Sequence, residues 1–150
     1  MINNLENPTI KNLKCPCCGE GYFRENLEET FNEFLEKVNK ENIHYVEGFR
    51  CSYYNEQMNG DEDSPHLFGS AIDFHFNETE KILDVYNIAK MYYPRIGLYL
   101  NYNNKTYIHV DNNEERGYLY WVKTNDQYIY FKTYVDFEKW ISVKFKDKKI

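Results

Sequence analysis

The chain has 150 residues, of which 42% are apolar, and this length and composition suit one compact domain with a single core. Its formal net charge is -6, and no run of basic residues alternates with aromatic ones, so the sequence excludes extended contact with nucleic-acid phosphates. No stretch is long and apolar enough to span a bilayer, and the first residues lack the apolar centre of a secretory signal. We therefore expect a monomer that is made in the cytoplasm and has no membrane span.

The first part of the chain, residues 1–24, is predicted to be irregular, because prolines and glycines interrupt it repeatedly. A helix should follow, since Asn26 and Glu29 form a capping-box pattern. This helix is predicted to end near residues 39–42. Its apolar residues recur at helical spacing and form one buried face: Leu27, Phe31, Phe34, Leu35 and Val38.

The middle of the chain alternates between regular and irregular segments. A short strand is predicted at His44–Phe49, and the polar stretch Cys51–Ser64 is predicted to be a loop. Residues 70–76 alternate strictly between apolar and other residues, which indicates a half-buried strand. A second helix begins at Asn77 and ends before Pro94. Its predicted core residues are Ile82, Leu83, Tyr86 and Ala89.

The last third of the chain is predicted to be mainly strands. Their expected ranges are Ile96–Tyr102, Thr106–Asp111, Tyr118–Lys123 and Gln127–Tyr134. Asp136 is expected to cap a final helix that carries Phe137, Trp140 and Ile141. Helices grouped around consecutive strands predict an α+β fold, with a mainly antiparallel sheet and flanking helices in one domain, residues 1–150.

Three of the four cysteines form a cluster near the start of the chain, at Cys15, Cys17 and Cys18. This cluster resembles part of a zinc site, but no second Cys or Cys/His pair follows at zinc-finger spacing. The sequence therefore leaves two interpretations open, a structural metal or free thiols in a reducing compartment.

Two of the predicted strands share a design that suggests a metal site. Strand 70–76 places Asp73 opposite its apolar face, and strand 106–111 places His109 in the same way. If these strands are neighbours, both side chains face one point, and Gly69 allows the loop that carries His66 to bend back over the sheet. Two imidazoles and a carboxylate make a three-ligand zinc site with an open position for water. Zinc bonds of about 2.0–2.2 Å would bring the three ligand atoms within about 4 Å of one another.

The residues alone also allow plainer interpretations. A lone His in a strand is often a surface or hydrogen-bonding residue, and Asp73 can equally cap a turn or pair with a lysine. His44 and His75 are interpreted as structural, although His75 shares the face of Asp73 and can support a ligand from behind.

The segment from Ser64 to Asp73, SPHLFGSAID, resembles the signature Ser-x-His-x-x-Gly-x-Ala-x-Asp of the zinc D-alanyl-D-alanine peptidases. That family includes D-Ala-D-Ala carboxypeptidases, vancomycin-resistance dipeptidases and phage L-alanyl-D-glutamate endolysins, and the hedgehog signalling domain shares its fold. Further similar segments are Gly48–Cys51 with Asn55, the strand Tyr107–Asp111, the early Cys-x-Cys-Cys-Gly and the stretch Gly117–Val122. The resemblance covers residues 15–123.

The resemblance implies a set of functional residues. His66, Asp73 and His109 would bind Zn²⁺, and Arg50 would hold a substrate carboxylate or stabilise the oxyanion. Asn55 and Ser64 would contact the substrate.

One position departs from the family pattern, because several branches carry an acidic general base where this chain has Thr106. A hydroxyl group cannot act as that base. Asp111 is the nearest alternative, either as the base or as a partner that orients His109, and the sequence does not decide between these roles.

The function implied by the resemblance is a zinc metallopeptidase that hydrolyses peptide bonds in peptidoglycan stem peptides or crosslinks. It would be a D,D-carboxypeptidase or an endopeptidase such as a phage endolysin, reaching the cell wall after its release from the cell. The alternatives are a non-catalytic module that binds zinc or peptidoglycan, and a structural phage component on the same fold.

Overall fold

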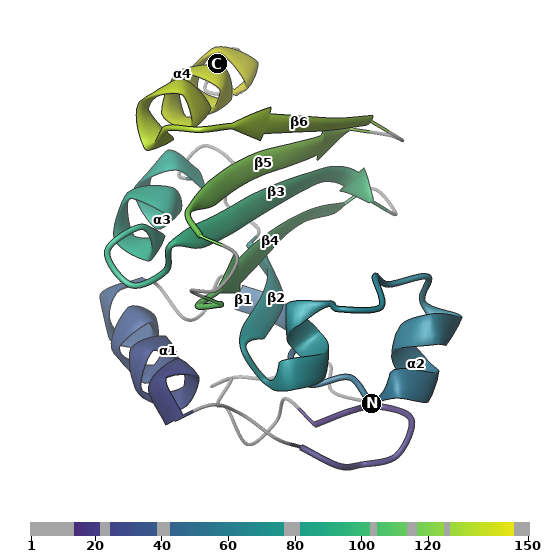
Figure 1. Cartoon of the computed structure of the whole chain (residues 1–150). Coiled ribbons are helices and arrows are strands. Elements are labelled where there is room, and N and C mark those ends of the chain that lie inside the picture. The colour runs from purple at the N-terminus through teal and green to yellow at the C-terminus, as the bar shows by residue number, and fades with distance from the viewer. Residues whose placement is uncertain are drawn as a thin grey trace.

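The computed structural model describes residues 14–21, 25–38, 43–76, 82–102, 105–113, 117–124 and 127–145. Most of the irregular N-terminal segment, the side chain of Asn26 and the proposed helix start at Asn77 lie outside the described part. Within it, the chain forms the predicted α+β fold, with helices packed on a mainly antiparallel sheet (Figure 1).

The sheet has six strands in the order β1-β2-β4-β3-β5-β6. Their bounds are β1 Ile43–Glu47, β2 Ala71–Phe76, β3 Arg95–Tyr102, β4 Lys105–Asp111, β5 Leu119–Thr124 and β6 Gln127–Phe131. All neighbouring strands are antiparallel except β3 and β5, which are parallel. The predicted neighbourhood of strands 70–76 and 106–111 is therefore confirmed, since β2 and β4 lie side by side at the centre.

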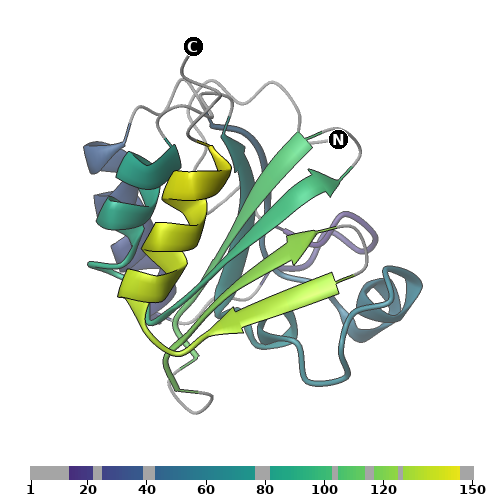
Figure 2. The ribbon, with the colours of Figure 1, turned by 90° about the horizontal axis from the view of Figure 1, so that it is seen from above.

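Three helices cover one face of the sheet (Figures 1 and 2). They are α1 Glu25–Lys37, α3 Ile82–Ala89 and α4 Tyr134–Lys144. Their apolar stripes meet the apolar face of the strands in one core, which includes Phe31, Phe34, Ile72, Phe74, Tyr86, Ile96, Ile108, Val110, Phe137 and Ile141. Burial of these side chains holds the sheet rigid and leaves its other face free for polar groups. None of the helices in the described ranges is long and apolar enough to cross a membrane.

The other face of the sheet carries two short helices, α2 Ser52–Gln57 and the 3-10 helix η3 Pro65–Phe68. The prediction that Cys51–Ser64 is all loop was therefore wrong. Cys51 starts α2, because its sulfur accepts a hydrogen bond from the backbone N–H of Tyr54 at 3.4 Å. The segment is polar and shows no apolar period, so its sequence gave no sign of a helix.

The end of β6 also differs from the prediction. The strand was expected to reach Tyr134, but it ends at Phe131 and α4 begins at Tyr134. Thr133, not Asp136, caps this helix, since its hydroxyl accepts from the backbone N–H of Asp136 at 3.2 Å. The hydroxyl of Tyr134 donates to Asn87 of α3 at 2.8 Å, so tertiary contact holds Tyr134 in the helical layer.

A single row of cross-strand neighbours on the polar face organises the sheet. The pairs Glu47–Asp73, Asp73–His109, Gly97–His109 and Gly97–Trp121 run across five neighbouring strands, from β1 to β5. Directly opposed residues lie about 4.5–5.5 Å apart, which brings the side chains of Asp73 and His109 into contact. Gly97 has no side chain, and the indole of Trp121 lies over its backbone.

We expect Gly97→Ala to lower the free energy of unfolding by about 1–3 kcal/mol, the usual range for overpacking. A methyl group at Gly97 would lie 2.5 Å from Cε2 of Trp121, so the indole has to move. Urea denaturation measures the change. The control is the same substitution in a Trp121→Ala background, where the clash is absent and the cost should nearly vanish. Equal costs in the two backgrounds would show that the close approach of the indole is not the cause.

Candidate metal centre

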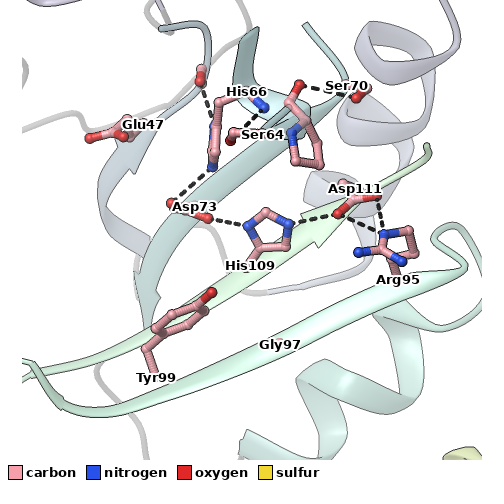
Figure 3. Close-up of polar contacts among 12 residues, drawn as sticks. Glu47, Ser64, His66, Ser70, Asp73, Arg95, Gly97, Tyr99, His109 and Asp111 are labelled. Carbon is pink, nitrogen blue, oxygen red and sulfur yellow. Dashed lines mark hydrogen bonds and ion pairs between the residues drawn. The ribbon is translucent and has the colours of Figure 1, made fainter. Parts of the chain in front are cut away.

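Three side chains from separate elements converge on the polar face, as the strand pattern predicted. They are His66 on η3, Asp73 on β2 and His109 on β4, and their candidate ligand atoms all lie within 4.8 Å of one another. The Asp73 carboxylate stands between the two imidazoles, 3.1 Å from Nε2 of His66 and 2.7 Å from Nδ1 of His109. Figure 3 shows the three side chains pointing toward one another.

His66 presents its Nε2 atom to this point. Its Nδ1 lies 2.6 Å from the carbonyl oxygen of Gly48, which can only accept, so Nδ1 carries the hydrogen. The other nitrogen, Nε2, is buried and makes no hydrogen bond. It faces the Asp73 carboxylate, another acceptor, and two acceptors in contact require a cation or a proton between them. The position of His66 thus fits a metal ligand.

His109 is held in the same way from its far side. Its Nε2 donates to Asp111 at 2.7 Å, which leaves Nδ1 facing Asp73. Burial alone would lower the pKa of His109, but the carboxylates of Asp73 and Asp111 raise it to about 9. Burial opposes ionisation of Asp73 as well, but His66 and His109 hold the pKa of its carboxyl well below the ordinary value. The site therefore keeps a carboxylate and attracts positive charge.

Asp111 lies behind the imidazole of His109, away from the point of convergence (Figure 3). It is fully buried and accepts from Nε2 of His109, Nε of Arg95 and the backbone N–H of Asn113. Of the two roles left open by the sequence, this position suits the one that orients His109, because a group behind the ring does not face a water on the open side.

Arg50 is brought beside Asp73 by the loop between β1 and α2. Its Nη2 lies 3.6 Å from Asp73, and Glu47 and Asn55 brace it at 2.6 Å and 3.2 Å. The Arg50 side chain is 14% exposed, so part of the guanidinium remains open to a ligand. Asn55 is buried and also donates to the backbone carbonyl of Asp61 at 2.7 Å. Asn55 therefore supports Arg50 and the loop from behind, where the resemblance implied a substrate contact.

The signature segment builds the turn that delivers His66. The Ser64 hydroxyl caps η3 by accepting from the backbone N–H of His66 at 3.3 Å. Gly69 ends η3 in the left-handed conformation, with φ of 67°, where glycine is favoured. Ser64 is buried and borders the cavity, but its hydroxyl is engaged in this cap.

A cavity of about 720 Å³ opens over the converging side chains. The loop that precedes η3 forms one wall, and aromatic residues of the sheet form the other: Tyr99, Tyr107, Trp121, Tyr128 and Tyr130. The Tyr99 hydroxyl accepts from Nε1 of Trp121 at 3.1 Å and points toward His109 (Figure 3). Sequence reasoning missed Glu47, Tyr99 and Arg95. For Arg95 and Tyr99, alternation along β3 was the available signal, since both share the polar face with Gly97.

The comparisons with known proteins agree with this arrangement. The family model described as Peptidase M15 matches residues 10–111. No curated protein and no solved structure matches the chain. The matched range covers more than half of the chain and contains His66, Asp73 and His109. The chain therefore belongs to the peptidase M15 family, whose members are zinc-dependent metallopeptidases.

Proposed function

We propose that His66, Asp73 and His109 bind a catalytic Zn²⁺ and that the protein hydrolyses peptide bonds in peptidoglycan stem peptides or crosslinks. The observation that carries the proposal is the buried Nε2 of His66, which faces the Asp73 carboxylate with no hydrogen bond of its own. Within the described residues, no fourth His, Cys, Asp or Glu joins this group, which fits a catalytic site with an open position. When bound, zinc supplies Lewis-acid polarisation of a carbonyl and a water of lowered pKa.

Arg50 and Tyr99 are placed to act on the substrate beside the metal. The pKa of Arg50 is raised, because Glu47 and Asp73 outweigh the effect of burial, so its charge persists at every working pH. It can hold a substrate carboxylate or stabilise the developing oxyanion. Burial and the nearby Asp73 raise the pKa of Tyr99, so its hydroxyl keeps its proton. The hydroxyl can therefore donate a hydrogen bond to the same oxyanion.

The cavity suits a peptide that carries carboxylates. Arg50 stands at the metal end and Lys123 lies over the ring of Tyr128, 5.3 Å from its centroid. Stem peptides of peptidoglycan offer free carboxylates and small side chains, which match two cations and a shallow aromatic wall. A D,D-carboxypeptidase or an endopeptidase of the endolysin type would use these same groups.

A second function, a non-catalytic module that binds peptidoglycan, is favoured by one specific feature. Thr106 occupies the position of an expected general base, and Asp111 lies behind His109. The remaining carboxylates that border the cavity include Glu47, which is engaged by Arg50. A module that binds peptidoglycan without cleaving it would keep the metal-binding residues and would need no general base.

The decisive experiment incubates the zinc-loaded protein with purified cell walls and follows new amino groups and fragment masses. We expect cleavage by the wild type and a loss of at least about 10³-fold in His66→Ala, because the metal site loses a ligand. His75→Ala is the matched control, since His75 also lies on β2 but bonds the backbone carbonyl of Thr106 and does not border the cavity. It should remain active. Retained binding to cell walls with no new amino groups from the wild type would establish the binding module instead.

Asp111→Asn separates a positioning role from that of a general base. If Asp111 orients His109, the substitution should weaken zinc binding about 10–100-fold, and saturating zinc should restore most of the kcat. The pH–rate profile should then keep its shape. A kcat that stays low at saturating zinc, together with loss of the acidic limb of the profile, would make Asp111 the base. The readouts are zinc affinity by chelator competition and kcat against pH.

Zinc affinity should fall as the pH falls. Since the pKa of His109 is raised to about 9, the metal-free site holds a proton on this ring at neutral pH, and zinc has to displace it. Each pH unit below about 9 should therefore weaken apparent affinity about tenfold for this proton, with the dependence fading above that pH. Calorimetry in buffers of different protonation enthalpy measures the protons released. Release of no protons at neutral pH would contradict this prediction.

A further inference from the structure

The chain has four cysteines, and the fold gathers all of them in one place outside the proposed catalytic site. Cys15, Cys17 and Cys18 lie on the turn at the start of the described chain, and Cys51 lies at the N-terminus of α2. Their sulfur atoms are all within 4.8 Å of one another, and all four thiols are free. The sequence showed only the first three as a cluster, because Cys51 is far away along the chain.

The backbone around these sulfurs forms a tight turn that is closed by two hydrogen bonds. The N–H of Cys15 donates to the carbonyl of Glu20 at 2.7 Å, and the N–H of Gly19 donates to the carbonyl of Cys15 at 2.9 Å. Gly19 has a φ of 75°, with open space where a side chain would be, so its role is to let the chain turn back directly after Cys18. The turn presents Cys15 and Cys18 at the C-x-x-C spacing that zinc sites use.

Backbone N–H groups point at the sulfur atoms. The N–H of Cys51 donates to the sulfur of Cys15 at 3.5 Å, and the N–H groups of Cys17 and Cys18 face the same atom. The sulfur of Cys51 accepts from the N–H of Tyr54 at 3.4 Å. Donors directed at sulfur stabilise thiolates, the form in which cysteine binds metal.

The spacing of the sulfurs suits a tetrahedral ion better than a disulfide. The sulfurs of Cys17 and Cys51 are 3.6 Å apart. Zinc–sulfur bonds of about 2.3 Å place neighbouring ligands of a tetrahedron about 3.8 Å apart, whereas a disulfide needs about 2.0 Å. Four sulfurs that are all mutually close form a complete ligand set with no position left for water, which is the composition of a closed structural site.

We propose that Cys15, Cys17, Cys18 and Cys51 bind a second zinc ion in a structural tetrathiolate site that fastens the N-terminal segment to α2. This proposal is independent of the catalytic one. A metal at this site would also affect the cavity, because Cys51 is the residue after Arg50 and caps the helix that carries Asn55. A metal there fixes the backbone from which the Arg50 side chain reaches Asp73.

The test measures metal content and the cobalt spectrum of the whole protein, with no need for activity. A His66→Ala/His109→Ala variant, which lacks two ligands of the catalytic site, should still bind about one zinc per chain. Replacement of this zinc by Co²⁺ should give the intense near-ultraviolet band of thiolate-to-cobalt charge transfer. Cys17→Ser should weaken the band, because one of the four thiolate ligands is lost, and Ser52→Ala, an exposed neighbour of Cys51, should keep it at full intensity.

Several results would overturn the proposal. One is a double-histidine variant that binds no zinc, or binds cobalt without the charge-transfer band. Another is a mass about 2 Da below that of the reduced chain, with thiols that resist alkylation, which would mean a disulfide. A chromophore with bound iron would assign the cysteines to an iron–sulfur cluster. If Cys17→Ser fails to fold, the spectrum of the double-histidine variant still decides. Absence of cell-wall cleavage would count against the catalytic proposal and leave these readouts unaffected.

Discussion

The structure is organised around the carboxylate of Asp73, which stands between two imidazoles whose facing nitrogens are not committed to any other hydrogen-bond partner. The contact between Nε2 of His66 and this carboxylate brings two acceptors together unless a proton or a metal ion lies between them. The fold nevertheless enforces it, by fixing the far nitrogen of each ring on an acceptor of its own, Gly48 for one and Asp111 for the other. The fold thus maintains a point that binds a proton or, in its place, a metal ion.

The placement of Asp73 between the two imidazoles depends on the apolar layer on the opposite face of the sheet. The pairs Asp73–His109 and Gly97–His109 are set by strand register, and register is fixed because the opposite face is buried against α1, α3 and α4. A slip of one residue would exchange the core and site faces of a strand. The buried ion pair of Arg95 and Asp111 adds little net stability in itself, but it gives His109 one orientation. Stability comes from one face of the sheet and chemistry from the other.

This division explains which features were predictable from sequence. Asp73 and His109 were assigned to the polar face from local alternation, since period-two patterning is a property of the strand itself. The role of Asp111 was not decided, because it depends on which imidazole nitrogen faces inward, a matter of side-chain rotation. The cap at Thr133 was missed in favour of Asp136, since both residues are good N-caps and tertiary contacts choose between them. The grouping of Cys51 with Cys15 was also missed, because long-range pairing leaves no periodic trace.

The residues that line the cavity lie on two kinds of backbone, regular strands and an irregular connection, which differ in how firmly the fold holds them. Asp73 and His109 lie on central strands, where neighbouring strands fix them on both sides. Arg50 lies on an irregular connection, which has few ladder hydrogen bonds and would otherwise sample several positions. A guanidinium that acts on the substrate, as proposed for Arg50, has to be held to within about 0.5 Å of its productive position, so this connection needs additional support. Glu47 and Asn55 hold the guanidinium, and the cysteine cluster one residue further on holds the backbone. The tight gathering of sulfurs therefore lies where the strands no longer provide rigidity.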